Sequence, residues 1–106
     1  MRHLAVDIGV PEEADARQLS EQLVEQRIAA GTRTGAAGVP THYRWEGAVH
    51  ERTYYTVTAL TTDEQLDRLY AFVETELDDD LPPITYEPFE ASEEYLDWVE
   101  SNTGAE

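Results

Sequence analysis

The fold is decided by residues 41–60, which read THYRWEGAVHERTYYTVTAL. Residues 41–46 and 53–60 are rich in β-branched and aromatic side chains, a composition typical of β-strands. Gly47 lies between the two runs and predicts that they form a hairpin. The sequence therefore predicts an antiparallel strand pair in the middle of the chain, and the other elements are placed around it.

The turn of this hairpin sets which side chains face each other. A two-residue type II′ turn formed by Gly47 and the next residue would place Arg44 opposite Glu51. In the same hairpin His42 and His50 could approach across the strands as an imidazole pair. Solvated or hydrogen-bonded histidines are the simpler interpretation of these two residues.

The N-terminal third of the chain predicts a strand followed by a helix. Residues 3–8 alternate apolar and polar side chains, which is the period of a strand. Pro11 suits the first turn of a helix that runs to Ala30, and Gly31 is placed to end it. The residues from there to Gly38 give no clear prediction.

The second half of the chain repeats this order. Two overlapping capping boxes, Thr61 with Glu64 and Thr62 with Gln65, predict the start of a second helix. Its apolar stripe has helical spacing and consists of Leu66, Leu69, Tyr70, Val73 and Leu77. Residues 84–89 then predict a short strand, in which a proline indicates a sheet edge or a strand end.

A last short helix is predicted after Ser92, whose side chain suits the N-cap position. Tyr95, Leu96 and Val99 are expected to face inward from it. The predicted order is β-α-β-β-α-β plus this helix, which is the split βαβ pattern. We therefore expect one domain over residues 1–106, an α+β ferredoxin-like sandwich with an extra C-terminal helix.

The chain is strongly acidic, with 23 Asp and Glu against 7 Lys and Arg and a net charge of −16. Such a charge repels phosphate backbones and anionic lipid, so neither nucleic acid nor a membrane is an expected partner. The carboxylates are dispersed and lysine is absent, which suits a cytoplasm of high salt such as that of a salt-loving archaeon. The competing interpretation is a carboxylate surface for Ca²⁺ or Mg²⁺.

Several kinds of chemistry are excluded by composition. The chain has no cysteine, so disulfides, thiolate metal sites and cysteine nucleophiles cannot form. It also has no phosphate-binding loop with a Walker lysine and no apolar run near the ~20 residues of a membrane span. We expect a cytoplasmic protein that is not an enzyme.

Three segments resemble those of the CutA divalent-cation-tolerance proteins. Residues 23–30, LVEQRIAA, are similar to the end of that family's first helix. Residues 43–47, YRWEG, look like its hairpin, and residues 95–99, YLDWV, resemble its closing helix. The resemblance implies a ferredoxin-like subunit, a PII-like homotrimer packed through its sheets, and a role in tolerance of divalent metals, copper most often.

The sequence departs from that family where soft copper ligands are expected. Gly31 stands at the position of a usual cysteine, and Leu77 at that of the principal histidine. Carboxylates surround the second position instead: Glu76, Asp78, Asp79 and Asp80. These hard ligands suit Mg²⁺, Ca²⁺ or Mn²⁺. A divalent metal ion is therefore a candidate cofactor at this run, and a solvated acidic loop is the simpler alternative.

The aromatic side chains of the hairpin are the second candidate site. Tyr43, Trp45 and Glu46 could line a cleft between subunits and bind a small ligand there. The alternative is that they pack a trimer interface, with Arg44 and Glu51 as its polar seam. The two functions that follow are divalent-metal tolerance and, as an alternative, PII-like regulation by a small ligand through an unknown protein partner.

Overall fold

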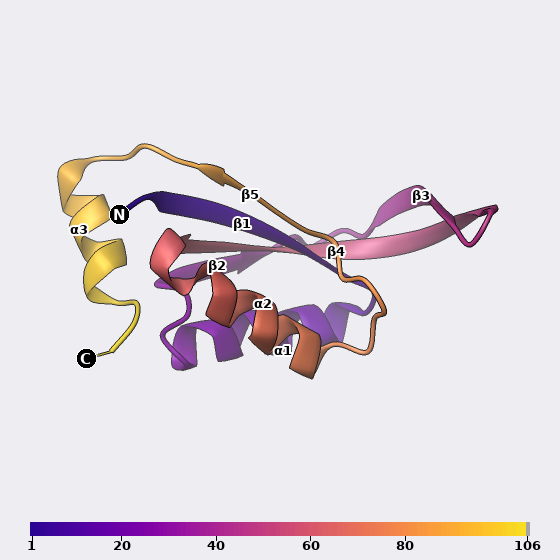
Figure 1. Ribbon diagram of the computed structural model, residues 1–106, viewed down its shortest axis with the longest axis horizontal. Helices are drawn as coiled ribbons and strands as arrows, with labels where there is room; N and C mark the ends of the chain where they lie inside the picture. Colours follow the sequence, from indigo (N-terminus) through magenta and orange to yellow (C-terminus); the bar gives the residue numbers. More distant parts are fainter. Residues whose placement is uncertain (106) are drawn as a thin grey trace.

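The computed structural model describes residues 1–105 and shows a mixed α+β fold (Figure 1). Its elements in chain order are β1 (His3–Val10), α1 (Glu13–Glu25), β2 (Gly31–Thr34), β3 (Val39–Trp45), β4 (Ala48–Thr62), a 3-10 turn η1 (Asp63–Gln65), α2 (Leu66–Glu76), β5 (Ile84–Pro88) and α3 (Glu93–Ser101). The ferredoxin-like arrangement expected from the sequence is confirmed, with α3 as the additional helix.

The long strand β4 organises the sheet, whose order is β2-β4-β1-β5 with β3 also paired to β4. All of these pairs are antiparallel. Strands β2 and β3 pair with successive stretches of β4, residues 57–60 and residues 48–54. The stretch from Gly31, which gave no prediction, therefore begins a strand, because β4 is long enough to pair with two strands on the same side.

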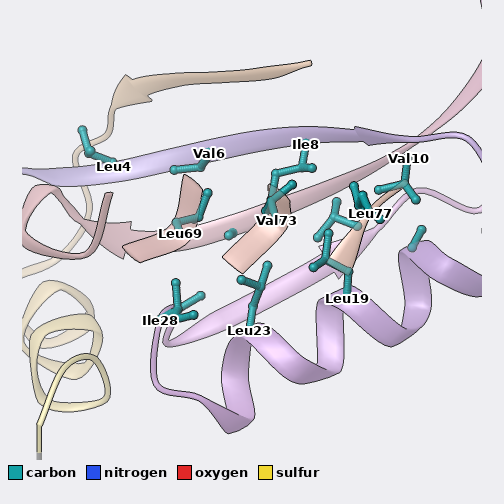
Figure 2. Close-up of a cluster of buried hydrophobic side chains, with 14 residues drawn as sticks. Leu4, Val6, Ile8, Val10, Leu19, Leu23, Ile28, Leu69, Val73 and Leu77 are labelled. Atoms are coloured by element: carbon teal, nitrogen blue, oxygen red, sulfur yellow. The ribbon is translucent and has the colours of Figure 1, made fainter. Parts of the chain in front are cut away.

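The hydrophobic core lies between one face of the sheet and the pair α1 and α2. Figure 2 shows Leu19 and Leu23 rising from α1 toward α2 and toward the apolar row of β1. That row, Leu4, Val6, Ile8 and Val10, is fully buried. The alternation in residues 3–8 thus predicted the buried face correctly.

The opposite face of the sheet, here called the open face, is not covered by α1 or α2. Asp7 of β1 lies on it between Thr58 of β4 and Thr85 of β5. The Thr58 hydroxyl donates a 2.7 Å hydrogen bond to Oδ1 of Asp7. Helix α3 lies at the end of the sheet where the chain begins, and Nε2 of His3 lies 2.7 Å from Oε2 of Glu100 (Figure 1).

The hairpin of β3 and β4 is present, but its predicted turn is wrong. The two turn residues are Glu46 and Gly47, with φ of 51° and 82°. Two positive φ angles give a type I′ turn, whose twist matches that of the paired strands. The register is consequently shifted by two residues, and Arg44 faces Val49 rather than Glu51. A shift of two keeps every side chain on its expected face.

The two hairpin histidines do not form a pair. His42 lies opposite Glu51, with Nε2 3.6 Å from Oε2, and His50 lies opposite Tyr43, with their rings stacked at 5.6 Å. Neighbouring register pairs point to opposite faces of a hairpin. His42 and His50 are therefore on opposite sides of it.

Helix α1 ends at Glu25, before the predicted end at Ala30. The cause is Arg27, which has a φ of 58°. The amide of Arg27 donates to the carbonyl of Val24, and that of Ile28 donates to Leu23. These bonds form a Schellman motif with arginine in the left-handed position that glycine usually occupies.

The predicted capping boxes at the start of α2 are not formed. Thr62 occupies the N-cap position of η1 without a side-chain cap, and Thr61 is buried and donates to the carbonyl of Ile28 at 2.6 Å. The carboxylate of Asp63 instead accepts a hydrogen bond from the amide of Arg2, which lowers the pKa of Asp63. A tertiary contact thus competes with capping for the hydroxyl of Thr61.

The predicted cap of α3 is confirmed, because Ser92 Oγ accepts a hydrogen bond from the amide of Tyr95. Val99 is fully buried, as expected. Tyr95, however, is 40% exposed in the single chain. Its ring packs on Trp98, at a centroid distance of 5.4 Å, rather than in the core.

Candidate functional site

A groove of about 660 Å³ lies on the open face where the hairpin leaves the sheet. Three parts of the chain form it: the hairpin, the middle of the sheet and the segment between α2 and β5. Its lining residues are Asp7, Gly9, Thr41, Tyr43, Arg44, Trp45, Arg52, Tyr54, Thr56, Asp78, Asp79, Asp80, Leu81, Pro83 and Thr85.

One side of the groove is aromatic because of the register of the hairpin. Tyr43 and Trp45 are two residues apart on β3 and therefore share a face. Tyr54 lies farther along β4 on that same face, since Tyr43 pairs with His50 and side chains alternate along the strand. These three residues, Tyr43, Trp45 and Tyr54, are here called the aromatic wall.

The other side of the groove is acidic and is tied to the hairpin by one ion pair. Nη1 of Arg52 lies 3.4 Å from Oδ2 of Asp79 and also donates to the hydroxyl of Tyr54 at 3.4 Å. The bond to Tyr54 raises the pKa of Arg52. Asp79 also accepts a hydrogen bond from the amide of Leu81. Asp79 therefore holds the 78–81 segment against β4.

The two candidate sites of the sequence analysis meet in this groove. Tyr43 and Trp45 line it, whereas Glu46 lies in the hairpin turn outside the lining. The acidic candidates divide in the same way. Asp78, Asp79 and Asp80 line the groove, whereas Glu76 is the last residue of α2 and does not.

Asp7 and Arg52 also line the groove, although the sequence alone did not assign them to a common site. The alternation of side chains along the strands could have indicated it, because alternate residues of two paired strands share the face that the helices leave open. Using that signal requires the pairing of β1 with β4, which brings together segments far apart in the sequence.

The donor set does not fit a resident metal ion. Within residues 1–105 no three His, Cys, Asp or Glu side chains are close enough together to hold a metal ion. Asp79, the middle residue of the acidic run, is already paired with Arg52. A single chain therefore offers separate carboxylates rather than a chelating centre.

The described part of the chain, residues 1–105, contains no helix that is both long enough and apolar enough to cross a membrane.

Together, the sheet, its two covering helices and the groove define a small α+β protein of the ferredoxin-like class with a ligand-sized site. Residues 4–102 match the family described as CutA1 divalent ion tolerance protein. The chain belongs to this family.

Similar proteins support the assignment over nearly the whole length. The divalent-cation tolerance protein CutA of Thermus thermophilus is 36% identical over 98 residues, which cover 92% of this chain and 94% of that protein. A solved structure of the Thermus thermophilus protein has a TM-score of 0.91 at 35% identity, covering 96% of this chain and 99% of that one. The solved structure of CutA from Synechococcus elongatus has a TM-score of 0.84 at 29% identity, and the match covers 97% of this chain and 91% of that one.

Proposed function

We propose that this chain acts in tolerance of divalent cations, as a binding protein rather than an enzyme, and that it does so as a homotrimer. The observation that carries the proposal is the family match over residues 4–102. The Thermus thermophilus relative, which is named for divalent-cation tolerance, matches over nearly its whole length.

Self-association is supported by the apolar surface that the single chain leaves exposed. Large hydrophobic side chains are exposed on both hairpin strands, on β5 and on α3, including Val39, Val49, Tyr86 and Trp98. A domain of this size gains stability when such side chains are buried between copies.

The cations that this chain suits best are hard ones. Gly31 and Leu77 supply no soft ligand for copper at the positions noted above, and the groove offers carboxylates instead. Asp78 and Asp80 are exposed. Carboxylate oxygens prefer Mg²⁺, Ca²⁺ or Mn²⁺. Because the donors of one chain do not chelate, we expect weak binding or a site that copies complete together.

Calorimetry with Mn²⁺ and light scattering in about 2 M KCl test this proposal. The scattering mass is expected to be three times the 12.0 kDa of one chain. The double variant Asp78→Asn/Asp80→Asn is expected to weaken Mn²⁺ binding about tenfold, because two anionic ligands become neutral. Glu76→Gln removes one carboxylate charge outside the groove, against two in the double variant, and is expected to change Mn²⁺ binding less than about twofold. A monomer, or equal losses in both variants, would contradict the proposal.

We further propose that the protein works in a cytoplasm of high salt. The net charge of −16 is carried without any lysine. At low ionic strength these carboxylates repel one another and destabilise the compact state, whereas near 1 M salt the screening length falls to about 3 Å.

The melting temperature is therefore expected to rise by roughly 10 °C or more between about 0.1 M and 3 M KCl, as followed by circular dichroism. Sucrose at matched osmolarity is the control, because it acts by exclusion from the surface and does not screen charge. A flat melting temperature in KCl, or an equal rise in sucrose, would contradict salt adaptation.

A second candidate function is favoured by the groove itself. Its volume of about 660 Å³ lies within the range of small-molecule sites, and one wall is aromatic. This arrangement supports a regulatory module in which a bound small ligand changes the surface offered to a protein partner.

A further inference from the structure

We propose that the copies of the homotrimer are joined by ion pairs across the open face, each between Arg33 of one copy and Asp7 of the next. The inference rests on the homotrimer proposed above and names the two residues that each copy contributes to its interfaces. It commits to a second copy of this chain as the partner that covers these two charges.

The register of the sheet places both residues in one row on the open face. Thr58 of β4 lies opposite Asp7 of β1 and also opposite Arg33 of β2. Residues directly opposite each other in paired strands point to the same face of the sheet. Asp7 points away from the core, because its neighbours on β1, Val6 and Ile8, are fully buried. Arg33 therefore points to the open face as well.

Neither charge is neutralised within its own chain. Strand β4 lies between the two residues, so their Cα atoms are about 10 Å apart, twice the spacing of paired strands. Within residues 1–105, no ion pair includes Asp7 or Arg33. The Thr58 hydroxyl donates to Oδ1 of Asp7 at 2.7 Å, which leaves Oδ2 available. Both residues are exposed in the single chain.

Packing of another copy against the open face removes both charges from water. Burial of an unpaired charge is costly, and the cost is offset only when the covering surface supplies an opposite charge with good geometry. The chain itself carries one charge of each sign in this row, so a second copy can supply both partners. The surface is thus complementary to itself.

The positions of the two charges suit a closed ring of copies. In a cyclic trimer each copy presents two different patches, one to each neighbour. Arg33 lies on the edge strand β2, whereas Asp7 lies on β1, on the other side of β4. Opposite charges therefore occupy two sides of one face. Arg33 of each copy can meet Asp7 of the next copy, and the same ion pair recurs at every interface.

Glu87 is the other carboxylate on this part of the open face. It lies opposite Ala5 on β5, which is an edge strand. A side chain at the edge of a sheet can turn outward to water, whereas Asp7 has a strand on either side of it. Covering the open face therefore desolvates Asp7 more than Glu87, and Asp7 has the greater need of a cationic partner.

The test is dissociation of the trimer on dilution, followed by light scattering in about 1 M KCl. Arg33→Asp is expected to raise the concentration of half-dissociation at least about tenfold, because two carboxylates then face each other. The charge-swapped variant Asp7→Arg/Arg33→Asp again pairs opposite charges. It is expected to return to within about threefold of the parent protein.

Two control variants separate this contact from a general effect of charge. Arg17→Asp makes the same change of charge on α1, where the side chain is 73% exposed in the layer on the other side of the sheet. It is expected to change dissociation less than about twofold. Arg33→Asp/Glu87→Arg offers the arginine on β5 instead, and is expected to remain as weak as Arg33→Asp. Circular dichroism checks that each variant keeps the parent fold.

A crosslink tests directly whether the two positions meet between copies. The chain has no cysteine, so Arg33→Cys and Asp7→Cys each introduce a single thiol. The two variants are unfolded, mixed and refolded together, and then treated with a short bismaleimide. A product with the mass of two chains is expected in the mixture and much less of it in either variant alone. This measurement does not depend on how well the swapped charges fit.

The inference is overturned if the charge-swapped variant stays as weak as Arg33→Asp, if the Glu87 swap restores the trimer equally well, or if mixing the cysteine variants adds no crosslink. These results leave the proposed function intact when the parent protein is a trimer. A parent protein with the mass of one chain would instead overturn the homotrimer itself, and this contact with it.

Discussion

Leu23→Ala is expected to lower the free energy of unfolding by about 3–4 kcal/mol. The side chain of Leu23 is fully buried and points from α1 into the core between the helices and the sheet (Figure 2). Its backbone carbonyl also accepts the amides of Ile28 and Ala29 at the end of the helix, so the surrounding backbone cannot easily move in to fill the cavity. The cost therefore includes both lost burial and an unfilled space.

Val24→Ala is the matched control for this substitution. Val24 is the next residue on the same helix and is 39% exposed in the single chain. Its truncation leaves no cavity and replaces a β-branched residue by the best helix former, so we expect a change below about 0.5 kcal/mol. Urea unfolding in constant KCl and at one protein concentration measures both variants. Similar losses in the two would show that Leu23 is not held in a rigid core.

Arg27→Ala is expected to cost about 2–3 kcal/mol, because one side chain ties the C-terminal segment to the end of α1. Its Nε donates to the carbonyl of Gly104 at 2.8 Å, and its Nη2 donates to that of Ser101 at 2.8 Å. The amide of Gly104 donates in return to the carbonyl of Arg27 at 2.8 Å. Hydrogen exchange is expected to rise first in α3, which this contact anchors.

Arg27→Gly separates two contributions to stability, that of the side-chain hydrogen bonds and that of the backbone strain. Glycine adopts a positive φ without the cost of roughly 1–2 kcal/mol that other residues carry there, whereas alanine keeps that cost and loses the same bonds. Arg27→Gly is therefore expected to be more stable than Arg27→Ala by about 1 kcal/mol. If the glycine variant proved equal or less stable, the strain assigned to the φ of 58° would be wrong.

Local patterns predicted the elements of the fold well. The alternation of residues 3–8 and the N-cap at Ser92 are properties of neighbouring residues, and the structure confirms both. The stripe of α2 is confirmed at Leu69 and Val73, whereas Leu77 is buried but lies just beyond the end of the helix. The hairpin was predicted for the same reason. Its register was not, because a single glycine is compatible with two turns that differ in which residues have positive φ.

Distant contacts account for what local patterns missed. An arginine with positive φ has no sequence signature, and at Arg27 it is stabilised by Ser101 and Gly104 at the other end of the chain. Similarly, the hydroxyl of Thr61 does not cap the helix, because it donates a hydrogen bond to the carbonyl of Ile28 in the interior. Patterns within short stretches of sequence cannot predict such contacts, because the residues that make them are far apart in the chain.

The candidate site was predicted in halves. From the sequence alone, the aromatic residues of one segment and the aspartates of another were proposed as two separate sites, a cleft between subunits and a metal loop. Only the pairing of β1 with β4 and the contact between Arg52 and Asp79 show that they share one groove.

The length of β4 also bears on how the chain folds. Its outer part pairs with β3 across a two-residue turn, a contact between close neighbours that can form within microseconds. Its inner part pairs with β1, which lies at the N-terminal end of the chain, and must wait for a large loop to close. The hairpin can therefore serve as an early template, on which the first strand and its helix assemble later. We therefore expect the docking of β1 within the chain to follow the formation of the hairpin.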